Sequence, residues 1–150
     1  MGRLNISVEA LLESQNSHRE GIFLGGTCND SQWRESLIPL LTKPYFNPIV
    51  EVYSEESQQQ EQLYKEQAAV NLYVITPKQT GFYSFAEMMA NAIKDPKRTV
   101  IGILNEDGDQ SWDDNQLKSI EAIKRLVEAE SAVSVLDSLE SIASECNSRG

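Results

Sequence analysis

The 150-residue chain has only two cysteines and one histidine, and each scarcity argues against a class of site. Cys28 and Cys146 lie near opposite ends of the sequence, and neither belongs to a C-x-x-C pair. With His18 they do not supply the ligands of a tetrahedral zinc site. A Ser-His-Asp triad is also disfavoured, because His18 precedes the first predicted strand. We therefore expect no metal, no cofactor and two reduced thiols in a reducing compartment.

Basic residues and long apolar runs are also scarce. Thirteen Lys and Arg stand against 23 Asp and Glu, which gives a formal net charge of −10. Because binding to DNA or RNA requires neutralisation of phosphates, polymeric nucleic acid is disfavoured as a partner, whereas a small phosphorylated ligand is not. No apolar run approaches the ~20 residues of a membrane helix, and no signal-peptide pattern opens the chain. The sequence therefore predicts a cytoplasmic protein with no membrane partner.

Short apolar runs alternate with helix-length segments along most of the chain. Their continuous hydrophobicity is typical of strands that are buried on both faces of a parallel sheet. The predicted strands cover residues 21–24, 45–50, 70–75, 99–104 and 131–136. The predicted helices cover residues 31–41, 54–69, 82–93 and 115–127, and a last helix begins at 136. Right-handed crossovers between such strands predict an α/β three-layer sandwich with a flavodoxin-like five-stranded parallel sheet, order 2-1-3-4-5.

Residues 21–150 are predicted to form a single domain behind an N-terminal extension, residues 1–20, in which 7–13 has the spacing of a short helix. In a sheet of this order, ligands bind beyond the carboxyl ends of the strands, where strands 1 and 3 lead to opposite faces. That rule nominates the loops at 25–31 and 76–84 as the walls of a binding site. The acidic stretch 106–114 lacks the spacing of a calcium loop and is interpreted as a solvated loop.

The most informative motif lies at the start of the helix after the third strand. Residues 80–87 read TGFYSFAE, a glycine loop that leads into a helical turn carrying a carboxylate. Two interpretations of this carboxylate stay open on spacing alone. Ser84 and Glu87 have the spacing of a capping box, in which each side chain bonds the other residue's backbone N–H. Alternatively, Glu87 is a catalytic group.

Five short motifs within residues 21–104 together resemble the nucleoside 2-deoxyribosyltransferase-like family. The motifs are Gly25-Gly26-Thr27, Trp33-Arg34, Phe46-Asn47-Pro48, VITP at 74–77 and TGFYSFAE at 80–87. The resemblance implies that Glu87 attacks the anomeric carbon of a 2′-deoxyribose. It also implies that the glycine loop before Glu87 and the loop after the first strand shape the pocket for the sugar and the base.

The chemistry of such a reaction explains why a carboxylate is needed. Breaking an N-glycosidic bond builds oxocarbenium character at the anomeric carbon, which a carboxylate can stabilise or trap covalently. A proton donor must also neutralise the leaving base. The Asp residues that the resembling transferases use have no counterpart here, either between Pro77 and Glu87 or at Gln62, so Glu66 is the candidate substitute. Base exchange, hydrolysis and binding without turnover all stay open.

The predicted site residues follow from the resemblance and from the switch-point rule. The catalytic residues are Glu87 and Tyr83, the latter covering the sugar or orienting Glu87 unless it is an ordinary packed aromatic. The predicted substrate-binding residues are Gly25, Gly26, Thr27, Asp30, Asn47, Glu66, Thr80, Gly81 and Ser84. Asp30 either contacts the ligand or caps the following helix. Asn47 either bonds a base edge or shapes the turn before Pro48.

The sequence thus predicts a small enzyme that cleaves or exchanges the base of a 2′-deoxynucleoside or its monophosphate. Arg34 is placed to reach a phosphate or an acidic side chain. A non-catalytic nucleotide-binding protein that keeps the fold is the alternative, followed by a phosphate-binding structural domain of a larger assembly. Because a switch-point cleft in so small a domain is shallow, we expect a homo-oligomer, in which the N-terminal segment and the pair Phe82 and Phe85 are the candidate interface with a second copy.

Overall fold

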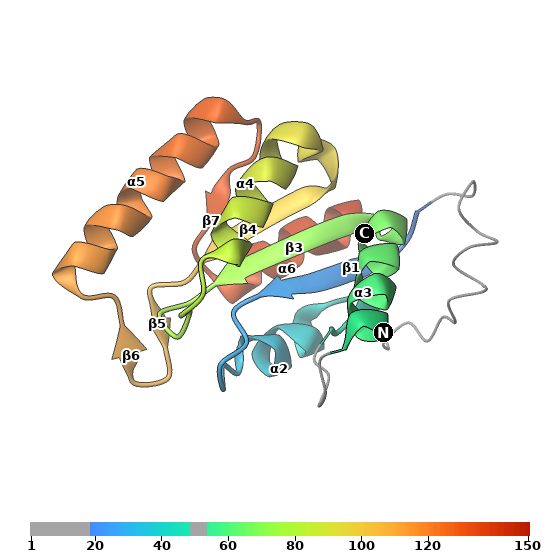
Figure 1. The fold of residues 1–150 in the computed structure, drawn as a ribbon, viewed down its shortest axis with the longest axis horizontal. Helices are drawn as coiled ribbons and strands as arrows, with labels where there is room; N and C mark the ends of the chain where they lie inside the picture. The colour runs from blue at the N-terminus through green and yellow to red at the C-terminus, as the bar shows by residue number, and fades with distance from the viewer. Residues whose placement is uncertain (1–18, 49–53) are drawn as a thin grey trace.

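In residues 19–48 and 54–150, which the computed structural model describes, the chain folds around a five-stranded parallel sheet with helices on both faces (Figure 1). The strands of this sheet are β1 (Ile22–Gly26), β2 (Tyr45–Phe46), β3 (Val70–Ile75), β4 (Thr99–Ile103) and β7 (Val135–Leu136). Their order is β2-β1-β3-β4-β7, which is 2-1-3-4-5 when only this sheet is counted. The predicted three-layer α/β fold with a flavodoxin-like sheet is therefore confirmed.

The two helical layers belong to different parts of the chain (Figure 1). One face of the sheet is covered by α2 (Trp33–Leu37), the 3-10 turn η1 (Ile38–Leu40) and α6 (Leu139–Arg149). The other face is covered by α3 (Glu55–Gln67), α4 (Tyr83–Lys94) and α5 (Asp114–Glu130). A second 3-10 turn, η2 (Pro96–Arg98), leads from α4 into β4. The predicted helix at 31–41 is therefore two shorter elements, α2 and η1.

Alternate residues of the central strands bury their side chains on opposite faces of the sheet. In β3, Leu72 and Val74 pack with α2 and α6, whereas Tyr73 and Ile75 pack with α4 and α5. Phe23 of β1 packs on the α3 side. Every residue of β3 is buried, as its continuous apolar run predicts for a central parallel strand.

Gly26 ends β1 in a conformation that side chains rarely adopt, because its φ is +120°. A Cβ here would lie 2.0 Å from the carbonyl oxygen of Val74. We therefore expect Gly26→Ala to lower the free energy of unfolding by about 2 kcal/mol or more, measured by urea denaturation. Gly81→Ala is the matched control, because its Cβ would meet only the Gln79 side chain, at 3.9 Å, and should change stability by less than about 0.5 kcal/mol. Equal unfolding midpoints for wild type and Gly26→Ala would contradict this account of the strand end.

The last predicted strand, 131–136, is wrong over its first four residues. Ser131 is the C-cap of α5, and its Oγ donates to the carbonyl of Val127 at 2.7 Å. Only Val135–Leu136 pairs with β4. Helix α5 begins as predicted, because the Asp113 side chain accepts from the backbone N–H of Gln116 at 2.7 Å.

The acidic stretch 106–114 is mostly exposed, as predicted, but it contains a hairpin that the sequence analysis did not predict. Strands β5 (Glu106–Asp107) and β6 (Gln110–Ser111) pair antiparallel. Gly108 lies in the turn between them with a φ of +63°. The two turn residues between the paired Asp107 and Gln110 are Gly108-Asp109, a hairpin signal that the sequence analysis overlooked.

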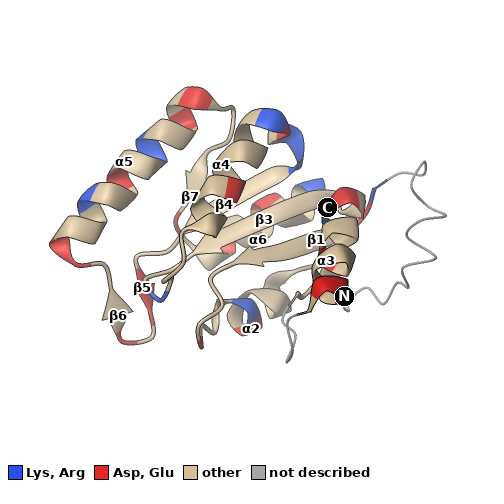
Figure 2. Cartoon of the chain, in the orientation of Figure 1, with Lys and Arg blue, Asp and Glu red and all other residues tan. Residues whose placement is uncertain are grey.

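Parts of the predictions lie outside the described residues. These are the helix expected at 7–13, His18 and the last two residues of the strand expected at 45–50. Within the part of the chain that the structure does describe, no helix is both long and apolar enough to cross a bilayer. Figure 2 shows Lys and Arg distributed over several elements, α2, α4 and α5 among them. The exclusion of polymeric nucleic acid stays a prediction from charge.

Candidate active site

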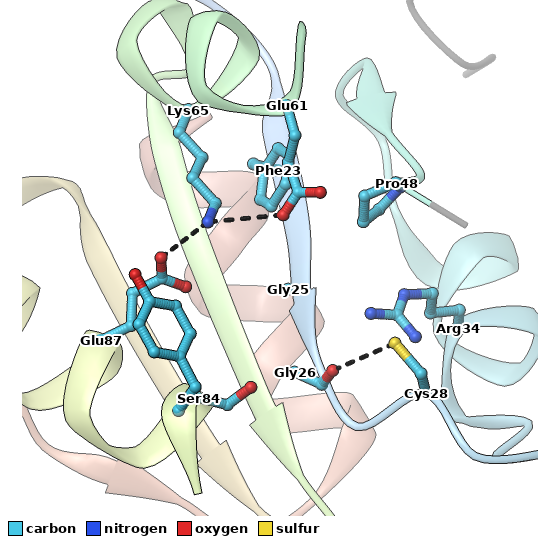
Figure 3. Close-up of a pocket in the computed structure, with 11 residues that line it drawn as sticks. Phe23, Gly25, Gly26, Cys28, Arg34, Pro48, Glu61, Lys65, Ser84 and Glu87 are labelled. Atoms are coloured by element: carbon cyan, nitrogen blue, oxygen red, sulfur yellow. Dashed lines mark hydrogen bonds and ion pairs between the residues drawn. The ribbon is translucent and has the colours of Figure 1, made fainter. Parts of the chain in front are cut away.

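A cavity of about 400 Å³ opens at the carboxyl end of β1 (Figure 3). At this end of the sheet the chain leaves β1 for α2 on one face and leaves β3 for α4 on the other. It is therefore the switch point at which sheets of this order bind ligands. The lining residues are Phe23, Gly25, Gly26, Cys28, Arg34, Pro48, Glu61, Lys65, Tyr83, Ser84 and Glu87. The predicted site residues among them are Gly25, Gly26, Tyr83, Ser84 and Glu87.

Two carboxylates face one ammonium group at the edge of this cavity. Lys65 of α3 donates to Oε2 of Glu87 on α4 at 2.8 Å. The same Nζ lies 3.5 Å from Oε1 of Glu61, one helical turn earlier on α3. All three side chains are less than one-third exposed, and Figure 3 shows both contacts as dashed lines. The shorter contact goes to Glu87, so Glu61 is the less tightly paired carboxylate.

Glu87 is not part of a capping box, so that interpretation is wrong. Helix α4 begins at Tyr83, and its N-cap is Phe82, which makes no side-chain capping bond. Ser84 lies inside the first helical turn, whereas a capping box requires the residue with the hydroxyl to stand before the helix. Glu87 instead contacts Lys65 on the facing helix.

The floor of the cavity is formed by β1. A Cβ at Gly25 would lie 2.9 Å from the carbonyl oxygen of Leu72, so this position accepts no side chain without a shift of β3. Phe23 supplies an apolar surface, and the ammonium of Lys65 lies 5.2 Å from the centre of its ring. A ligand placed here would have an apolar surface beneath it and charged groups at its edge.

The opposite wall is formed by Arg34 of α2 and by the loop after β1. Arg34 is buried, and its Nη1 donates to the carbonyl of Thr27 at 2.7 Å. The indole N–H of Trp33 donates to the same carbonyl at 2.8 Å, and the guanidinium lies 4.4 Å from the centre of the Trp33 ring. Helix α2 thereby fixes the loop that carries Cys28.

Thr27, a predicted substrate-binding residue, holds the two loops together and does not line the cavity. Its side chain is buried, its Oγ1 donates to Gln79 Oε1 at 2.7 Å, and it accepts from the backbone N–H of Thr76 at 2.9 Å. Asp107 of the hairpin adds a second connection. It accepts from the hydroxyls of Ser31 and Thr76, the latter at 2.6 Å. The hairpin that the sequence analysis missed therefore fixes the walls of the site.

Thr80 and Gly81 also connect the loops and do not line the cavity. Thr80 Oγ1 accepts from Asn29 Nδ2 at 2.6 Å, and the Gly81 carbonyl accepts from Gln79 Nε2 at 2.9 Å. Both residues are exposed. The glycine loop is thus placed by hydrogen bonds to its neighbours.

Asp30 does not cap the following helix, because the N-cap of α2 is Gln32. Asp30 is exposed with a φ of 58°, its carbonyl accepts from Lys78 Nζ at 3.3 Å, and it does not line the cavity. Asn47 precedes the cavity-lining Pro48, and the choice between its two predicted roles stays a prediction.

Glu66, the predicted substitute for the missing Asp, does not line the cavity. It lines an adjoining hollow of about 280 Å³ that shares Lys65 and Glu87 with the cavity, and its carbonyl accepts from Arg98 Nη2 at 3.1 Å. Glu61 occupies the cavity in its place. The carboxylate of this helix that does line the cavity therefore comes more than one turn before the predicted one.

The aromatic residues at the start of α4 have separate environments. Phe82 is 83% exposed and Tyr83 is 76% exposed beside the cavity, whereas Phe85 packs against the core. Phe85 is therefore a core contact, and of the predicted pair only Phe82 is exposed enough to contact a second copy. The oligomeric state itself stays a prediction.

No family model, curated protein or solved structure matches this chain. Among the described residues, no three His, Cys, Asp or Glu side chains gather closely enough to hold a metal ion. The fold is a doubly wound parallel α/β fold, and the cavity with its paired carboxylates lies at its switch point. What the protein does must be argued from those residues.

Proposed function

We propose that this protein cleaves the N-glycosidic bond of a 2′-deoxynucleoside or its monophosphate, with Glu87 as the nucleophile. The observation that carries the proposal is the arrangement of Glu87, Lys65 and Glu61 at the edge of a cavity with an apolar floor. In residues 19–48 and 54–150, the one hydrogen bond to the Glu87 carboxylate goes to Oε2, which leaves Oε1 for attack. The resemblance to nucleoside 2-deoxyribosyltransferases points to the same residue.

In the first step, Glu87 Oε1 forms a bond to the anomeric carbon while the bond from that carbon to the base nitrogen breaks. The electron pair of that bond stays on the base, and Glu61 delivers the proton that neutralises it. Lys65 orients both carboxylates, and the apolar floor under the sugar excludes water from one side. The product is a glycosyl ester on Glu87.

In the second step, an incoming nucleophile breaks the ester at the anomeric carbon and restores the Glu87 carboxylate. If the nucleophile is water, Glu61 accepts its proton and the reaction is hydrolysis. If it is a second base, its ring nitrogen bonds the anomeric carbon, Glu61 accepts the N–H proton that it loses, and the reaction is transfer. Two displacements on one carboxylate retain the configuration at the anomeric carbon.

Incubation with 2′-deoxynucleosides and their monophosphates, with and without a second base, tests the proposal. We expect free base by liquid chromatography, and a new nucleoside in addition if the protein is a transferase. Ribonucleosides are the matched control for sugar specificity. Binding of the same compounds without release of base from any of them would favour the alternative, a nucleotide-binding protein without turnover.

A further inference from the structure

Arg34 lies across the cavity from the carboxylates and retains an uncompensated positive charge. It is 3% exposed, yet it lines the cavity. Its oxygen acceptors are two backbone carbonyls: Nε and Nη2 donate to Leu24 at 3.1 and 3.0 Å, and Nη1 donates to Thr27 at 2.7 Å. The Cys28 side chain is a further hydrogen-bond partner. Within the described ranges, Arg34 forms no ion pair. A carbonyl oxygen is neutral, so these bonds leave the charge unmatched.

These three bonds hold the loop after β1, but they use only part of what a guanidinium offers. Of its five N–H groups, one on each terminal nitrogen donates to no oxygen atom of the described residues, and the Cys28 side chain is the only other hydrogen-bond partner there. Figure 3 shows the guanidinium directed toward the cavity with the sulfur of Cys28 beside it. A fork of this kind matches two oxygens of a phosphate group.

Burial makes an unpaired cation unfavourable, which is the physical reason to look for an anion. Desolvation lowers the pKa of Arg34 below its ordinary value, although Cys28, Glu35 and Glu61 act in the opposite direction. Glu61 faces Lys65 on the far side of the cavity and forms no ion pair with Arg34. A structural arginine without a ligand role is normally matched by a carboxylate when it is buried to this degree.

We propose that Arg34 binds the phosphate of the substrate, so that the substrate class is a 2′-deoxynucleoside monophosphate and not the nucleoside. This inference rests on the proposed function for the placement of the sugar. With the anomeric carbon at Glu87, the phosphate lies at the Arg34 end of the cavity. The two ends of the cavity then have different roles. The carboxylates act on the glycosidic bond, and Arg34 binds the phosphate.

Binding measurements on Glu87→Gln, which removes the nucleophile, separate recognition from turnover. Isothermal titration with each 2′-deoxynucleoside, its 5′- and 3′-monophosphates and inorganic phosphate identifies the group that is recognised and its position. We expect one monophosphate to bind about tenfold or more tightly than its nucleoside, the range of a charge-assisted hydrogen bond. Equal affinities for the nucleoside and both monophosphates would overturn the inference.

A charge placed beside Arg34 tests the role of the guanidinium without removing its bonds to the loop. Cys28→Asp supplies a carboxylate at the cavity side of Arg34, and Cys28→Asn is the uncharged variant of the same shape. We expect the ratio of monophosphate to nucleoside affinity to fall to near one in Cys28→Asp and to stay at about tenfold in Cys28→Asn. Equal ratios in the two variants would overturn the inference.

The two proposals fail in different ways. Tight, charge-dependent binding of the monophosphate with no release of base by the wild-type chain leaves the phosphate site standing and refutes the proposed reaction. Release of base from nucleosides and monophosphates at equal kcat/KM supports the reaction and refutes the phosphate site. Binding of inorganic phosphate that is lost in Cys28→Asp supports the site even if no nucleoside binds.

Discussion

Replacing Glu87 by glutamine should lower the rate of base release by about a thousandfold or more, which corresponds to about 4 kcal/mol of lost transition-state stabilisation. The amide keeps the shape of the side chain and can still accept a hydrogen bond from Lys65. It carries no charge to stabilise an oxocarbenium-like centre, and it cannot form the glycosyl ester. Steady-state assays of base release measure the change, and titration with the same compound shows whether binding persists.

The control for this variant is Glu121→Gln. Glu121 is a carboxylate on α5 that contacts Lys124 at 3.4 Å, away from the cavity, so the same substitution there should leave the rate unchanged. Because Glu87 does not cap α4, its replacement should lower the free energy of unfolding by only about 1–2 kcal/mol, through the weakened contact with Lys65. A rate within about twofold of wild type would exclude Glu87 as the nucleophile.

Replacing Glu61 by glutamine should lower the rate by about 10²–10⁴-fold, the range for loss of a general acid. Glutamine cannot deliver a proton to the leaving base, so steady-state assays of base release should show this loss with every substrate whose base must be protonated to leave. A substrate whose base leaves without protonation should be affected much less.

Glu66→Gln is the matched control for the proton donor. Glu66 lies on the same helix and lines the adjoining hollow that shares Lys65 and Glu87 but not the cavity itself, so we expect its replacement to lower the rate of base release far less than Glu61→Gln does. A larger loss of rate in Glu66→Gln than in Glu61→Gln would make Glu66 the donor. The assignment from the structure would then be wrong.

The fold was predictable because its signal is local and redundant. Residues 70–75 form a continuous apolar run, and β3 occupies the same positions with every residue buried. The run at 99–104 likewise gives β4, which ends one residue earlier. Buried parallel strands need apolar side chains on both faces, so their apolar runs can be recognised in the sequence without knowing which strands are neighbours. The alternation with helices indicates a doubly wound parallel sheet, for which 2-1-3-4-5 is one of the common strand orders.

The location of the site was predictable for the same reason, but its chemistry only in part. The switch-point rule placed the cavity at the loops after β1 and β3, and the motif at 80–87 contained Glu87. The role of Ser84 could not be read from spacing, because a helix that begins at Tyr83 places that hydroxyl inside its first turn. A residue is an N-cap only if it stands immediately before the helix, so an error in the predicted start of the helix changes the role assigned to its side chain.

Glu61 and Lys65 could not be assigned to the candidate site from the sequence, because the sequence of α3 does not indicate which side of the helix faces the cavity. This helix is rich in Gln and Glu and contains no buried residue. Its polar sequence is typical of a solvated helix, and only its packing over β1 brings two of its charges to the cavity. Their spacing of four residues indicated a helical ion pair and no more.

The most direct test of the central claim is to trap the intermediate on Glu87. Incubation with a 2′-deoxy-2′-fluoro nucleoside or its monophosphate, whose electron-withdrawing fluorine slows breakdown of a glycosyl ester, should raise the mass of the intact chain by one fluorinated glycosyl unit. Digestion and tandem mass spectrometry should place that unit on Glu87, and Glu87→Gln should remain unlabelled under the same conditions. An adduct on another residue, or an unlabelled wild-type chain after one equivalent of base has been released, would contradict the proposed mechanism.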